Sequence, residues 1–169
     1  MTSEIPRWHP LRRSVRGNVG GAIYGLILGA SIIAASSQKN GDVAGLVDLY
    51  LIVTLVVFWA AHVYSHVLGK WIEDRNTPTW DLIRREMIFE WPMVSAPLVP
   101  ALILLLAVFD LIRDRVAIDL ALTVALAELT LTVVYAARAA GANTRETVVS
   151  AVVAIAFAGA VVFLKIAIH

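Results

Sequence analysis

Residues 116–137 read VAIDLALTVALAELTLTVVYAA, an apolar run of 22 residues with Glu128 near its middle. A helix needs about 20 such residues to cross a hydrocarbon core about 30 Å thick. The run therefore predicts a membrane-spanning helix whose central carboxylate lies near the bilayer midplane. A charged group at that depth costs at least about 2.5–3.5 kcal/mol, so it normally faces a partner or a water-filled cavity. Glu128 is for this reason the first candidate functional residue.

Four further apolar runs reach spanning length, at residues 18–37, 43–68, 87–109 and 147–168. Only 16% of the residues are charged, against about 25% in soluble domains. The remaining segments are too short to fold separately, so we expect residues 1–169 to form a single transmembrane domain. The predicted fold class is all-α: a polytopic membrane protein built as a bundle of five transmembrane helices. The run at 18–37 is long for a signal peptide, and we expect a retained span.

The basic residues are unevenly distributed between the two sides of this predicted bundle. The N-terminus and the second and fourth loops hold ten Lys and Arg residues, and the other side holds four. Because cytoplasmic loops carry an excess of Lys and Arg, we expect a cytoplasmic N-terminus and an outer C-terminus in the cell (inner) membrane.

Two segments outside the runs are expected to lie along the inner membrane surface. Residues 1–17 mix arginines with Trp8 and other apolar residues, a pattern typical of lipid headgroup contact. This segment either recognises lipid or only anchors the topology, and we prefer the anchor; it is too short to favour nucleic acid. Thr77 and Pro78 then predict the start of a short interfacial helix before the third span.

A glycine ladder occupies the first span, with four glycines at intervals of four residues. On a helix these positions form one groove into which another backbone can sink. The groove accepts either a helix of the same chain or a helix of a second copy, and we prefer a homo-oligomer. The four residues are Gly17, Gly21, Gly25 and Gly29.

Acidic residues and histidines recur at several depths of the predicted bundle. Asp48 shares a stripe of the second span with His62 and His66, because steps of three and four residues stay on one helix face. Prolines in the third span are expected to kink it and to free backbone carbonyls. Such a polar series can carry protons or small cations. Its members are Asp48 and Asp119 outside, Glu128 with Thr132 and Tyr135 in the fourth span, and His62, His66 and Glu90 inside.

Each of these residues also has a structural explanation. Asp48 and Asp119 lie close enough to the surface to pair there. Glu90 can pair with Arg84 or Arg85, and the two histidines can bond across helices. For Glu128 the alternative is a hydrogen bond to a neighbouring helix.

A metal site is a further alternative. His62 and His66 have the spacing that lets two imidazoles bind one ion, and Glu90 could be a third ligand. The catalytic HExxH pattern is missing, because residues 63 and 64 are Val and Tyr. The chain holds only four histidines and no cysteine. We therefore expect no cofactor.

Three functions fit these features. The first is a channel or transporter that moves protons or small cations along a path centred on Glu128. The second is a membrane-embedded enzyme, with or without a metal, that modifies a lipid with His62, His66 and Glu90. The third is a non-catalytic membrane subunit that binds a partner through the glycine groove. We prefer transport, and with it a protein that is not an enzyme.

Overall fold

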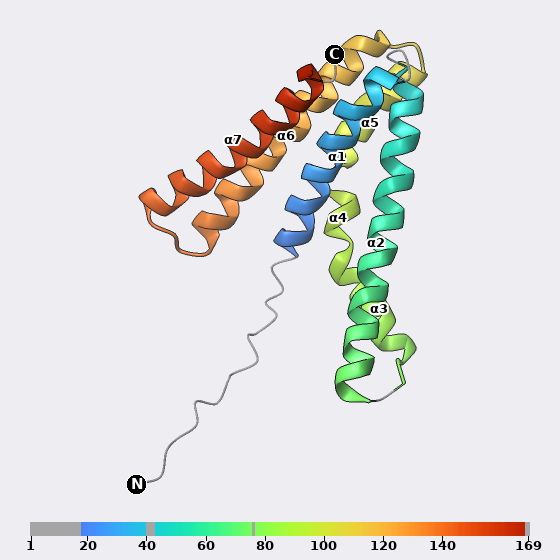
Figure 1. Ribbon diagram of the computed structural model, residues 1–169, viewed down its shortest axis with the longest axis vertical. Coiled ribbons are helices and arrows are strands. Elements are labelled where there is room, and N and C mark those ends of the chain that lie inside the picture. The colour runs from blue at the N-terminus through green and yellow to red at the C-terminus, as the bar shows by residue number, and fades with distance from the viewer. Residues whose placement is uncertain (1–17, 40–42, 76, 168–169) are drawn as a thin grey trace.

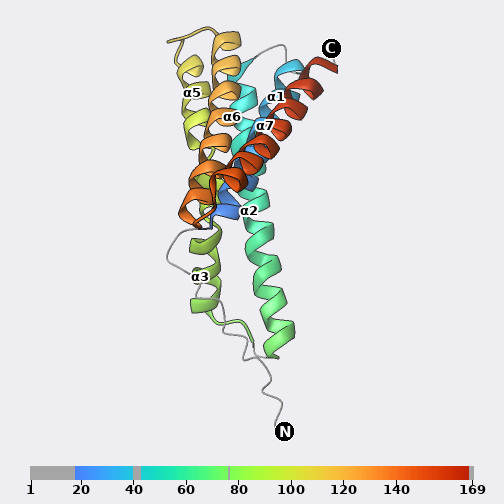
Figure 2. The same ribbon diagram turned by 90° about the vertical axis from the view of Figure 1, so that its left-hand side faces the viewer.

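The computed structural model describes residues 18–39, 43–75 and 77–167, and all elements in these ranges are helices. Figures 1 and 2 show their arrangement. The predicted interfacial segment at residues 1–17, and Gly17 with it, lie outside the described residues. The helices are α1 (Val19–Lys39), α2 (Ala44–Asp74), α3 (Trp80–Glu90), α4 (Pro92–Ser95), α5 (Leu98–Val108), α6 (Asp114–Ala139) and α7 (Thr144–Ala167).

Four of these helices, α1, α2, α6 and α7, are long and apolar enough to cross a membrane. Helices α3 and α4 form one arm of a bent pair, and α5 forms the other arm. Counting this pair as one span gives a fifth. Many large apolar side chains also lie on the outer surface, among them Leu49, Val57, Leu102, Leu131 and Val152. A soluble monomer rarely exposes so much apolar surface, whereas lipid tails cover it at no cost. The all-helical class is confirmed, and the count of five spans stays a prediction.

The third predicted span differs from expectation in its boundaries. One helix was expected at 87–109, with a separate short helix before it. Instead α3 runs from Trp80 through Met87 to Glu90, and α3–α4 is bent by 55° relative to α5. Pro92 and Pro97 cause the interruptions, because a proline has no N–H to continue the helical bonding. Helix α3 also starts later than predicted, at Trp80. Its N-cap is Thr79, whose hydroxyl accepts a hydrogen bond from Leu82 N at 3.4 Å.

Helix α1 lies in the middle of the molecule and contacts α2, α4, α6 and α7. The hairpin α2–α3 and the hairpin α6–α7 diverge on either side of α1 toward its N-terminal end (Figure 1). The core that joins them is made of alanines and branched residues, which allow close helix approach. Its members include Ala30, Ile33, Leu51, Leu104, Ile118 and Ala121.

Glycines of the ladder fit α1 against the broken span. A Cβ built on Gly25 would overlap the carbonyl oxygen of Met93 and lie 2.9 Å from its carbonyl carbon. Pro97 cannot donate to this carbonyl, so Met93 O is free to rest against the glycine. One turn later, a Cβ on Gly29 would lie 3.3 Å from both Leu51 Cδ1 and Pro97 Cβ. Gly25 and Gly29 therefore pack within one chain, and the homo-oligomer stays a prediction.

Candidate functional site

A polar cluster lies where α2, α3 and the start of α1 meet. Glu86 and Glu90 are one turn apart on α3 and are only 1% and 2% exposed. Opposite them, His66 Nδ1 lies 3.0 Å from Glu90 Oε1 and 3.4 Å from Glu86 Oε2. Lys70 Nζ forms an ion pair with Glu86 Oε1. Two buried carboxylates thus share His66, and Lys70 pairs with one of them.

The helical hairpin α2–α3 creates this arrangement. His66 and Lys70 are four residues apart on α2, and Glu86 and Glu90 are four apart on α3, so each pair occupies one helix face. The chain reverses direction between the helices at Arg75, whose φ of 53° is left-handed. Because the helices are antiparallel, Lys70 meets Glu86 and His66 reaches Glu90.

Asn18 ties the cluster to α1. Its Nδ2 donates to Glu90 Oε2 at 2.8 Å, and its Oδ1 accepts from Gly21 N at 2.8 Å. The second bond caps the first turn of α1, whose initial N–H groups have no partner within the helix. One side chain therefore starts α1 and holds a buried carboxylate.

We expect Asn18→Ala to lower the free energy of unfolding by about 2 kcal/mol, through loss of the cap and of a hydrogen bond to a charged group. Asn18→Asp is the informative companion, because it keeps the cap acceptor but places a second carboxylate beside Glu90. Thermal unfolding in detergent micelles checks both. If Asn18→Asp is as stable as the wild type, the bond to Glu90 contributes nothing.

One side of the cluster is exposed and the other is buried. The side chain of His66 is 42% exposed although both its carboxylate partners are buried. The imidazole therefore lies at the boundary between the buried carboxylates and the surface of the molecule.

Comparison with known proteins provides no further assignment. No family model, no curated protein and no solved structure matches the chain. A function for this chain therefore has to be inferred from the geometry of the site.

His62 does not join the cluster. Its Nδ1 lies 3.0 Å from Phe58 O, and its ring centroid lies 5.2 Å from that of Tyr24. Across the described ranges, no three His, Asp or Glu residues are placed to hold a metal ion. The structure therefore does not bring His62, His66 and Glu90 together, because the α2 stripe turns only His66 toward α3. The metal site stays a prediction.

Glu128 and Asp48 lie apart from the cluster. Glu128 Oε2 and Asp48 Oδ1 are both buried, and neither accepts a hydrogen bond from the part of the chain that the structure describes. Asp48 is 18 residues before His66 on α2, which places it about 27 Å away along the helix.

The other predicted path residues lie toward the outside of the bundle. Tyr135 is 74% exposed, and Thr132 is half-buried. Asp119 is exposed, and its backbone carbonyl accepts a hydrogen bond from the Thr123 hydroxyl at 2.7 Å. The face of α6 that carries Glu128 thus turns outward as it approaches Tyr135.

Sequence reasoning missed Glu86, Lys70 and Asn18. The sequence contained a signal for two of these residues. Lys70 lies four residues after His66, and Glu86 lies four residues before Glu90, so each shares a helix face with a predicted site residue. Arg84 and Arg85, which were expected to pair with Glu90, are both exposed. Glu90 instead contacts His66 and Asn18.

Proposed function

We propose that the protein moves protons or small cations across the membrane, with the His66–Glu86–Glu90 cluster at one end of the path and Glu128 at its centre. The observation that carries the proposal is the cluster, in which a half-exposed histidine contacts two buried carboxylates. Stability alone favours apolar residues at such positions, because buried ion pairs recover little of their desolvation cost. Titratable groups at membrane depth usually belong to a proton or ion route.

Glu128 and the broken span support a path further into the bundle. Glu128 is 14 residues after the start of α6, about 21 Å along a helix about 39 Å long, and so lies near mid-depth. Helix α5 packs against α6 and belongs to the broken span, which is interrupted between Glu90 and Leu98. In transport proteins, interrupted helices at mid-depth commonly face substrate or ion sites.

The distribution of basic residues supports an orientation for this path. With a cytoplasmic N-terminus in the cell (inner) membrane, the cluster beside Asn18 lies at the cytoplasmic end and Asp48 at the outer end. A homo-oligomer would provide additional walls for a pore, since one chain of this size encloses little volume.

The test is ion flux into liposomes that contain the purified protein, with proton and K⁺ readouts under an imposed potential. We expect Glu128→Gln and His66→Gln each to reduce flux at least about tenfold, equivalent to about 1.4 kcal/mol of barrier. Glu73→Gln is the matched control, because Glu73 is exposed near the end of α2. Absence of flux in the wild type, or normal flux in both variants, refutes the proposal.

A further inference from the structure

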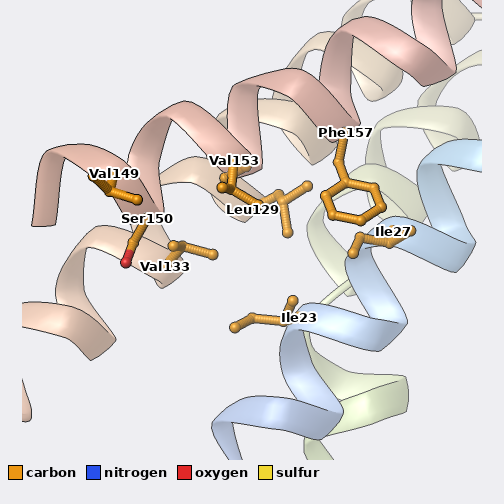
Figure 3. A pocket seen from close by; sticks show the side chains of 9 residues that line it. Ile23, Ile27, Leu129, Val133, Val149, Ser150, Val153 and Phe157 are labelled. Atoms are coloured by element: carbon orange, nitrogen blue, oxygen red, sulfur yellow. The ribbon is translucent and has the colours of Figure 1, made fainter. Parts of the chain in front are cut away.

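An apolar cavity of about 310 Å³ opens between α1, α6 and α7. Figure 3 shows Ile23 and Ile27 of α1 facing Leu129 of α6, while Val153 and Phe157 of α7 close the other side. The cavity exists because α1 and the hairpin α6–α7 diverge at this depth. Its volume is in the range of pockets that hold small molecules.

A second, polar cavity adjoins the first at the start of α7. It is lined by Asn143, Arg145 and Glu146, and it shares Val149 and Ser150 with the apolar cavity. The two cavities together form one groove, which is apolar along most of its length and polar at the end near the start of α7. A molecule that fits both parts must itself be amphipathic.

The polar end is lined by one positive and one negative side chain, Arg145 and Glu146. Glu146 Oε2 accepts a hydrogen bond from Asn143 N at 2.9 Å, and Asn143 Oδ1 accepts one from Glu146 N at 2.9 Å. This reciprocal capping engages the carboxylate at the start of α7. Arg145 is exposed and forms no ion pair within the described ranges. Its guanidinium is thus available to a phosphate, which it binds in a two-pronged geometry.

The length of the groove agrees with one leaflet of a bilayer. Arg145 and Phe157 are 12 residues apart, which is about 18 Å along α7. Half of a hydrocarbon core is about 15 Å. A lipid whose phosphate lies at Arg145 can therefore extend an acyl chain to Phe157.

We infer that this groove binds an anionic phospholipid, with the phosphate at Arg145 and one acyl chain between α1, α6 and α7. Under the proposed orientation the polar end faces the cytoplasmic leaflet, where anionic lipids give a negative surface potential. The inference rests on membrane insertion, which the proposed function shares, and not on ion movement. Its test is therefore binding, and a protein without flux can still bind the lipid.

The experiment is native mass spectrometry of the full chain in detergent, titrated with phosphatidylglycerol or with phosphatidylcholine of the same acyl chains. The wild type is expected to bind phosphatidylglycerol more tightly. Arg145→Gln is expected to reduce this preference about fivefold, the effect of one basic residue at an anionic surface. Arg113→Gln, at the opposite end of α6, is its control and should retain the preference.

A second pair of variants tests the apolar part. Val153 is half-exposed and lines the cavity, so Val153→Phe fills the cavity and is expected to weaken the binding of both lipids. Val152 is its exposed neighbour outside the lining, so Val152→Phe should leave the binding of both lipids unchanged. Equal binding of both lipids to the wild type overturns the inference. So does a change from dimer to monomer mass with Val153→Phe, which would assign the groove to a second copy of the chain.

Discussion

Gly25→Ala is expected to destabilise the protein by about 3 kcal/mol or more. Its new Cβ would overlap Met93 O and approach the carbonyl carbon to 2.9 Å. Inserting a methyl group into a packed core costs about 1–3 kcal/mol when side chains can adjust. Here the obstacle is backbone in a segment fixed by Pro92 and Pro97, so rotation of a side chain cannot relieve it.

Gly69→Ala is the matched control for this experiment. Gly69 also lies inside a helix, but a Cβ there would meet no atom within 4 Å. Alanine at that position should therefore be neutral or stabilising by up to about 1 kcal/mol, the difference in helix propensity. Thermal unfolding and recovery of folded protein in detergent measure both variants. Equal stability of the two would mean that α1 does not pack against Met93 as described.

The contrast between these glycines shows what sequence can predict about this fold. Span lengths follow from apolar runs, and the kinks follow from Pro92 and Pro97, since both are local properties of the chain. The contact between Gly25 and Met93 is not local, because it requires the register of α1 against a helix that is about 70 residues later. A glycine interval of four predicts a groove without naming the helix that fills it.

The site shows the same division between local and tertiary information. The sequence singled out His66 and Glu90 by their depth, and the structure brings them together. It did not single out Lys70, because a lysine beyond the end of a span is normally assigned to the membrane surface. The partner of Lys70 depends on the register of the hairpin α2–α3, which the turn near Arg75 sets. His62, on the same stripe, lies against Phe58 and Tyr24, since a small rotation of α2 decides which histidine faces α3.

Lys70→Met is expected to lower the free energy of unfolding by about 3 kcal/mol. Removing one partner of a buried ion pair typically costs about 3–5 kcal/mol, because the other charge stays buried without compensation. Glu86 is the charge left behind, and its side chain is 1% exposed against 30% for Lys70. We expect the lower end of that range, since His66 remains beside Glu86. Arg84→Met, on the exposed side of α3, removes one positive charge in the same region and should change stability by less than about 0.5 kcal/mol.

A double variant tests whether the ion pair causes this loss, because methionine largely preserves the packing of the lysine stem. If the loss in Lys70→Met comes from the stranded carboxylate, Lys70→Met with Glu86→Gln should recover about half of it, because a neutral amide is far less costly to bury. Additive losses would instead mean that Lys70 and Glu86 contribute to stability independently. Unfolding in detergent, measured for the two single variants and the double variant, gives the coupling energy. A strong coupling means that Lys70 and Glu86 contribute to stability as a pair.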